Sequence, residues 1–188
     1  MTNLVPTGDG QEASFNPRIR CWSEDRVKLT QVGRDQVIAN QVGEYLGWER
    51  FVEHVRGVLD ATGPHSIVSM SLQAIDRMEV SASGFTLGQY FNCDGQFIPR
   101  WYADCAVACD ITLGRGLVPV DGHNRVIKLQ LRTQDDKRSV RIDSTFHDAV
   151  KGADPFRKLD ELHEECTSAF EQLVTDETRT VVMGGKVS

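Results

Sequence analysis

The amino-acid sequence predicts an α+β fold in which a single curved antiparallel β-sheet carries two amphipathic helices on one face. Three observations predict this fold. Several short segments alternate apolar and polar residues, as strands with one wet face do. Most of these segments are joined by short polar connections, which favour antiparallel neighbours because a parallel pair needs a crossover of about a dozen residues or more. Two longer segments are apolar along one side only, so each needs a sheet face to cover.

The first third of the sequence predicts three strands followed by a helix. Strands are expected over residues 18–22, 26–32 and 36–40. We interpret Gly33-Arg34-Asp35 as the bend of a hairpin, because a phosphate-binding loop would contain several glycines and lead directly into a helix. The predicted helix ends at Gly63-Pro64. Its apolar stripe consists of Trp48, Phe51, Val52, Val55, Val58 and Leu59.

The remaining sequence predicts four more strands and a second helix. Strands are expected over residues 66–74, 107–113, 127–131 and 140–146, with an irregular aromatic segment over 87–102. Asp154 can cap the first amide groups of the last helix, and Pro155 fits its first position. A second cap at 175–177 predicts a short final turn. The apolar stripe of the last helix is Leu159, Leu162, Cys166, Ala169, Phe170 and Leu173.

The chain of 188 residues predicts one domain over residues 17–188, preceded by a polar, flexible leader over 1–16. It contains no run of about 18 apolar residues and no basic-then-apolar signal peptide, so we expect a cytoplasmic protein without membrane contact. The five cysteines are an odd number, which indicates reduced thiols rather than a disulfide framework.

The distribution of charge indicates a protein partner. A net charge of −6 argues against nucleic-acid binding, which needs a basic surface to displace counterions from phosphates. The charge is uneven, however: residues 115–141 hold seven basic and three acidic residues, and residues 148–177 hold nine acidic and three basic ones. Lys128, Arg132 and Arg141 are predicted on one wet sheet face, which suits an acidic partner, including the acidic helix of a second copy. Protection of an exposed sheet edge is an equal alternative.

A small-ligand pocket is a second candidate site. Asp76 and Arg77 could line a polar cleft if the aromatic segment, with Tyr90, Trp101 and Tyr102, folds over them. Aromatic walls with a few charged groups are typical of ligand pockets. The alternative is that these aromatic residues close one end of the core.

Catalytic and metal-binding motifs are missing from the sequence. It contains no G-x-S-x-G, no H-E-x-x-H and no glycine-rich nucleotide loop. Cys105 and Cys109 would lie about 13 Å apart on a regular strand, too far for one zinc ion. We therefore predict no catalytic residue, no metal and no cofactor.

Several motifs together resemble a sporadically distributed prokaryotic family of unknown function. They are a hairpin Q-x-x-R-D-x-x-x-x-N from Gln31 to Asn40, the G-W-x-x-F helix start from Gly47 to Phe51, and the closing L-D-E-L-H from Leu159 to His163. The resemblance covers about residues 18 to 183. It implies a similar order of hairpin, helix and closing helix, no established activity, and an accessory role in antiviral defence or mobile-element contexts.

From the sequence we expect a non-enzymatic interaction protein that works in a complex or as a homodimer. The alternative from a different class is a small-ligand-binding or hydrolytic domain that uses the pocket near Asp76, Arg77 and Trp101.

Overall fold

The computed structural model describes residues 19–63, 66–81, 83, 86–92, 108–115, 123–134 and 137–182. The chain divides into two compact units, residues 1–66 and 67–188, and each is described by itself. The predicted leader over 1–16 lies outside the described residues.

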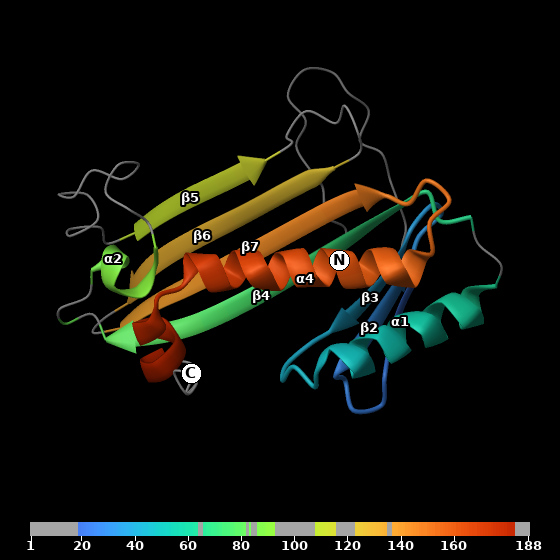
Figure 1. Ribbon diagram of the computed structural model, residues 1–188. Helices are drawn as coiled ribbons and strands as arrows, with labels where there is room; N and C mark the ends of the chain where they lie inside the picture. Colours follow the sequence, from blue (N-terminus) through green and yellow to red (C-terminus); the bar gives the residue numbers. More distant parts are fainter. Residues whose placement is uncertain are drawn as a thin grey trace, which may run out of the picture. The chain divides into compact units, whose positions relative to one another are not determined.

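The first unit is a three-stranded antiparallel meander followed by a helix (Figure 1). Its strands are β1 (Ile19–Trp22), β2 (Lys28–Val32) and β3 (Val37–Gln41), and its helix is α1 (Trp48–Thr62). The amide of Gly33 donates to the carbonyl of Gln36 at 2.9 Å and closes the turn between β2 and β3. The prediction that Gly33 to Asp35 form a hairpin bend is thus confirmed. The helix ends at Gly63, whose φ of 90° lies in the region that favours glycine.

The second unit contains a four-stranded antiparallel sheet in the order β4-β7-β6-β5. Its strands are β4 (Ser69–Ser81), β5 (Ala108–Arg115), β6 (Asn124–Gln134) and β7 (Lys137–Ala149). β4 and β7 pair along their whole length, from Ser69 opposite Ala149 to Ser81 opposite Lys137. The predicted succession of three strands before the last helix is confirmed, although β6 and β7 are longer than expected.

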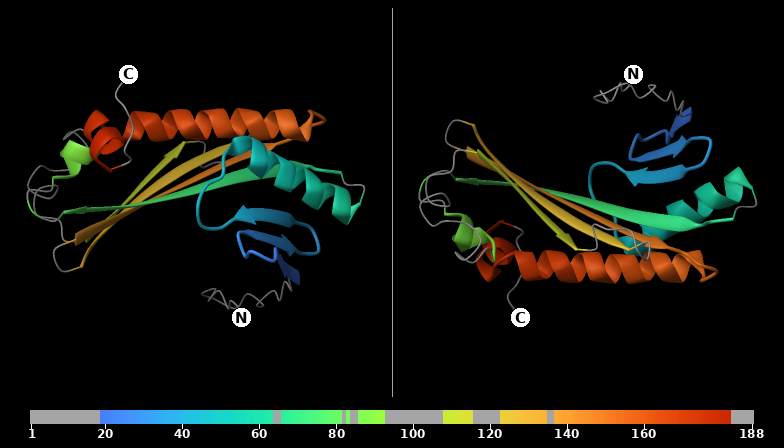
Figure 2. Two further views of the ribbon diagram at one scale, coloured as in Figure 1. Left: turned by 90° about the horizontal axis from the view of Figure 1, so that it is seen from below. Right: turned by 90° about the horizontal axis from the view of Figure 1, so that it is seen from above.

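A long helix, α4 (Pro155–Leu173), lies along one face of this sheet (Figure 2). The Asp154 carboxylate accepts a hydrogen bond from the amide of Phe156 at 3.1 Å, so the predicted cap at the start of the helix is confirmed. The core lies between the helix and the sheet. Its fully buried members include Leu131, Val140, Ile142 and Leu162.

One end of the core is closed by α2 (Leu87–Tyr90) and the π-helix η1 (Thr178–Val182). The amide of Asn92 donates to the carbonyl of Leu173 at 2.7 Å, and the amide of Thr175 donates to the carbonyl of Tyr90 at 3.1 Å. These bonds tie the segment after α2 to the end of α4. Phe91 is 1% exposed there, which confirms that part of the aromatic segment closes the core.

The α+β class and the antiparallel pairing are confirmed, but the prediction of a single sheet is wrong. The strands form two sheets, with α1 in contact with β3 and α4 in contact with β4 and β7. Short hairpins pair β1 with β2 and β2 with β3. In contrast, β4 pairs with β7, which is more than fifty residues away along the chain. Alternation shows which residues share a face, and it carries no information on which distant strand completes the pair.

None of the described helices is long and apolar enough to cross a membrane.

Candidate functional site

The four-stranded sheet has two chemically different faces. Side chains alternate between the faces along each strand, and the pairing registers show which residues of neighbouring strands point the same way. One face packs under α4 and includes Leu72, Met78, Leu129 and Ile142. We call the opposite face the outer face.

The three predicted partner-binding residues all lie on the outer face. Lys128 stands opposite Asp143, and Gln130, between Lys128 and Arg132, stands opposite Arg141. Two of the three residues form ion pairs on this face: Arg132 with Asp110 at 2.9 Å and Arg141 with Asp143 at 3.0 Å. The net positive charge of the outer face is therefore smaller than a count of its basic residues suggests, because acidic residues on the same face neutralise part of it. Its charged members are the basic Arg77, Lys128, Arg132, Lys137 and Arg141 and the acidic Glu79, Asp110 and Asp143, five against three.

The structure does not bring the predicted ligand-pocket residues together. Asp76 and Arg77 are consecutive residues of β4, so their side chains lie on opposite faces of the sheet. Asp76 points under α4, and Arg77 lies on the outer face opposite Arg141. Tyr90 packs against the core, and Trp101 and Tyr102 lie outside the described residues.

A small polar cluster lies beneath the middle of α4. It consists of Asp76 on β4, Ser144 on β7 and Cys166 on α4, and Ser144 is 1% exposed. Burial, and then the nearby Asp76 charge, raise the pKa of the Cys166 thiol, and a hydrogen bond with Ser144 opposes them; the resulting pKa is about 11. A thiol with this pKa is protonated at neutral pH, so Cys166 behaves as a core residue and not as a nucleophile.

We expect Asp76→Asn to stabilise the protein at neutral pH by about 1 kcal/mol. Burial raises the pKa of Asp76, so its charged form costs stability. Because the folded pKa is the higher one, this cost is absent below the ordinary pKa of 3.8 and is fully present above the folded pKa. Urea unfolding at pH 7 and at pH 3 should show the gain at pH 7 only.

The control for this substitution is Asp143→Asn, which removes the ion pair with Arg141 on the outer face. It should give no gain at pH 7. Equal unfolding midpoints for wild type and Asp76→Asn at pH 7 would show that the Asp76 carboxylate is well solvated.

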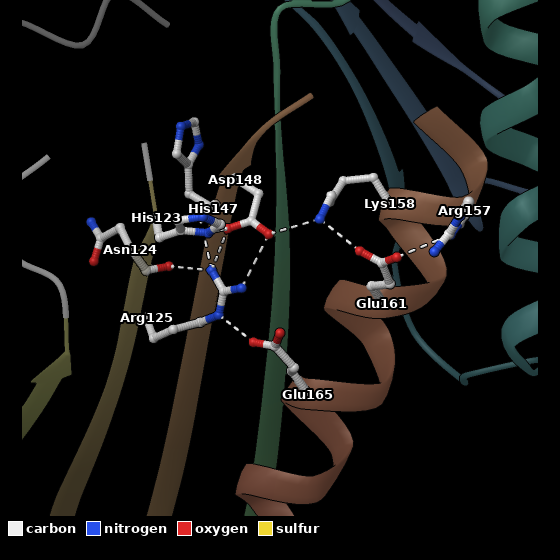
Figure 3. A network of polar contacts seen from close by, with 9 residues as sticks. All are labelled: His123, Asn124, Arg125, His147, Asp148, Arg157, Lys158, Glu161 and Glu165. Carbon is white, nitrogen blue, oxygen red and sulfur yellow. Dashed lines mark hydrogen bonds and ion pairs between the residues drawn. The ribbon is translucent and has the colours of Figure 1, made fainter. Parts of the chain in front are cut away.

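A charged network connects the sheet to α4 (Figure 3). At its centre is Asp148 on β7, whose side chain is 3% exposed. Arg125 on β6 donates to both carboxylate oxygens of Asp148, at 2.8 and 3.2 Å, and to the carbonyl of His147 at 2.8 Å. The Arg125 guanidinium also lies over the Phe146 ring, 5.2 Å from its centroid.

Three side chains of α4 complete this network. Glu165 accepts a hydrogen bond from Nε of Arg125 at 2.6 Å. Lys158 lies 3.5 Å from Asp148 and 2.6 Å from Glu161, so it joins both carboxylates. Since the partners come from β6, β7 and α4, the network fixes the position of the helix along the sheet.

His123 is the exposed member of the network. Its Nδ1 lies 2.5 Å from Asp148, and its side chain is 57% exposed. Burial alone would raise the pKa of Asp148, but the hydrogen bonds from Arg125 and His123 outweigh burial and hold it at about 2. An aspartate–histidine pair can orient a general base. Within the described part of the chain, His123 has Asp148 as its hydrogen-bond partner.

The sequence reasoning missed this network, although a signal for it was present. Arg125 has the same strand phase as Ile127 and Leu129, and Asp148 has the same phase as Ile142 and Phe146. A charged residue in the apolar phase of a strand indicates a buried ion pair. The acidic side of the last helix contributes Glu161 and Glu165 to the network.

The first unit has an open groove of about 490 Å³ between α1 and one face of its sheet. Lys28, Thr30 and Val32 of β2 lie on one side, and Glu53 and His54 of α1 lie on the other. Burial, and then the nearby charge of Lys28, lower the pKa of His54. Leu29 and Gln31 lie in the opposite strand phase, away from the groove.

Among the residues that the structure describes, no group of three or more histidine, cysteine, aspartate or glutamate side chains is arranged to hold a metal ion. Cys93 and Cys105 lie outside those residues.

No family model, curated protein or solved structure matches this chain. The resemblance to a prokaryotic family therefore stays a prediction. The outer face of the four-stranded sheet is the feature of the described residues that most clearly points to a function.

Proposed function

We propose that this protein is a non-enzymatic interaction protein, an accessory component of a complex that binds an acidic protein partner through the outer face. One observation carries the proposal. Lys128, Arg132 and Arg141 lie on the neighbouring strands β6 and β7 of this face, and no described helix or strand of the second unit covers it, while α4 covers the other face (Figure 2).

The outer face is rich in charged side chains, which suits a surface that recognises another protein better than a surface that is permanently buried. Two of its ion pairs are exposed: the side chains are 53% and 58% exposed for Arg132–Asp110 and 65% and 66% exposed for Lys137–Glu79. The Arg141–Asp143 pair is more buried, at 35% and 16%. Exposed charges contribute little to folding stability, but they raise the association rate and exclude wrongly charged partners. The affinity of such a complex should fall as ionic strength rises, because salt screens exposed charges.

The reactive side chains of the second unit take part in ion pairs or in core packing, which also favours a binding function over a catalytic one. Asp148 is held by Arg125, and Cys166 is a protonated core thiol. The small-ligand alternative gains no support, because Asp76 and Arg77 lie on opposite faces of β4. The accessory role in defence or mobile-element contexts remains part of the proposal, and the genes next to this one would test it.

The triple variant Lys128→Glu, Arg132→Glu and Arg141→Glu is expected to lose the partner. Affinity capture from the source cells, followed by binding assays with the purified partner, should show at least about a tenfold weaker complex. The binding should also weaken with added salt in the wild type and lose that dependence in the variant.

The matched control is Arg20→Glu, Arg34→Glu and Arg50→Glu, which makes the same change in net charge at exposed positions of the first unit. This control should keep the partner. Equal recovery by wild type and by the Lys128, Arg132 and Arg141 variant, with both proteins folded, would contradict the role of the outer face.

A further inference from the structure

The edge of the four-stranded sheet at β4 is long and unpaired within the described part of the chain. The strand order places β4 at one end of the sheet, where it pairs with β7 alone. Its 13 residues follow the register of β7 one by one, without a bulge. A strand of this length presents a row of free backbone donors and acceptors along its open side.

Most of the usual devices that protect a sheet edge are missing from β4. It contains no proline and no lysine, and its pairing with β7 shows no bulge that would twist the edge away. Asp76, which points inward, is its one inward-facing charge. An edge of this kind is a template for another strand.

Ile75, the central residue of β4, is an exposed hydrophobic residue on a polar face. It is 47% exposed, and its neighbours along the outer face of the strand are Gln73 and Arg77. Six residues of β4 precede Ile75 and six follow it. A two-fold axis through Ile75 would therefore pair the whole strand with a copy of itself.

We propose that a second copy of this chain pairs with β4 in antiparallel orientation, with the two-fold axis at Ile75, so that two four-stranded sheets join into one. This inference goes beyond the acidic-partner binding proposed above and specifies the homodimer that the sequence predicts. The two Ile75 side chains meet across the axis and remove each other from water.

The side chains on both faces of β4 agree with this register. On the inward face, Met70 comes opposite Val80 of the second copy and Leu72 opposite Met78, which are apolar pairs. On the outer face, Gln73 comes opposite Arg77 and Ser71 opposite Glu79. No residue meets a like charge directly across the pair.

Neighbouring registers are less favourable. An axis at Asp76 would place two carboxylates directly opposite each other on the inward face. An axis at Met78 would pair Arg77 with Glu79 but would leave residues 69–74 without a partner strand. The axis at Ile75 pairs every residue of β4 and places Asp76 opposite the small Ala74.

Cysteine cross-linking tests this register directly. In a Cys21→Ser background, which removes an exposed thiol, Ile75→Cys should give a disulfide-linked dimer under mild oxidation. Gln73→Cys is the matched control on the same face of the same strand. Its two thiol positions would lie about 13 Å apart, too far for a disulfide. Mass spectrometry of the linked peptides confirms the position, and cross-linking at 73 but not at 75 would overturn the register.

Light scattering tests the dimer itself. Ile75→Lys and Ile75→Glu each place like charges at the axis, so each should raise the dimer dissociation constant by about tenfold or more. Mixing the two variants should restore a heterodimer, and Ile75→Val should stay dimeric. Because Ile75 is exposed, thermal melting should confirm that all three variants fold.

The outcomes separate this inference from the proposed function. A wild-type protein that stays monomeric at every concentration overturns the dimer, even if the acidic partner is still bound through Lys128, Arg132 and Arg141. A monomeric Ile75→Lys variant that restores dimers with Ile75→Glu supports the dimer, whatever the result of the partner capture.

Discussion

Replacing Asp148 by alanine is expected to lower the free energy of unfolding by about 3 kcal/mol. The substitution removes a carboxylate that is 3% exposed and leaves Arg125, 16% exposed, without the acceptor of two of its hydrogen bonds. Breaking a buried pair by removing one partner is costly because the remaining charge stays buried. Glu165 still accepts from Arg125, which keeps the loss at the low end of the range for buried pairs.

Urea unfolding followed by circular dichroism measures this loss. The matched control is Asp110→Asn, which removes another aspartate–arginine ion pair, with Arg132, at an exposed position. The control should change the unfolding midpoint only slightly, because exposed pairs contribute little. Similar effects of the two substitutions would show that burial of Asp148 is not what makes its pair important.

The contribution of Asp148 should depend on pH with a definite sign. Its folded pKa of about 2 lies below the ordinary value of 3.8, so the charged form is the stabilised one. The stabilisation is therefore complete above the ordinary pKa and is lost as the pH falls from about 4 toward 2. The difference in stability between wild type and Asp148→Ala should shrink across this interval. A difference that stays constant down to pH 2 would contradict the low pKa of Asp148.

Replacing Leu162 by alanine should destabilise the second unit by about 2–5 kcal/mol. Leu162 is 0% exposed and lies in the apolar stripe of α4 that faces the sheet. The substitution removes buried methyl groups and leaves a cavity that the surrounding strands cannot fill without moving.

Leu113→Ala is the matched control for this substitution. Leu113 belongs to the edge strand β5 and is 50% exposed, so its truncation should cost less than about 1 kcal/mol. Urea unfolding of both variants should show a large shift of the midpoint for position 162 and a small one for position 113. Shifts of equal size would mean that α4 does not form the core described above.

The local elements of the fold were predictable because their signals lie within a few residues of one another. The turn at Gly33 to Asp35 and the start of α4 at Asp154 and Pro155 each depend on short-range backbone chemistry. The apolar stripe of α4 follows from its helical period, and four of its six predicted members are buried.

The chemistry of the sheet faces was only partly predictable. Alternation correctly placed Lys128, Arg132 and Arg141 on one face, because a period of two is a property of each strand alone. It could not show that Asp110 and Asp143 partly neutralise them, since those contacts depend on which residues stand next to one another. The pairing of Arg125 with Asp148 and Glu165 depends in the same way on the register of β6, β7 and α4.

The sequence by itself determined the order of most strands, turns and helices, though not the full length of β4, β6 and β7, and which side chains share a face, because these properties follow from local backbone preferences and periodicity. Only the tertiary structure decided that the strands divide into two sheets, that β4 becomes an open edge and that Asp148 becomes the centre of a buried network. Pairing between distant strands is settled by the packing of the whole core, and no short stretch of residues contains that information.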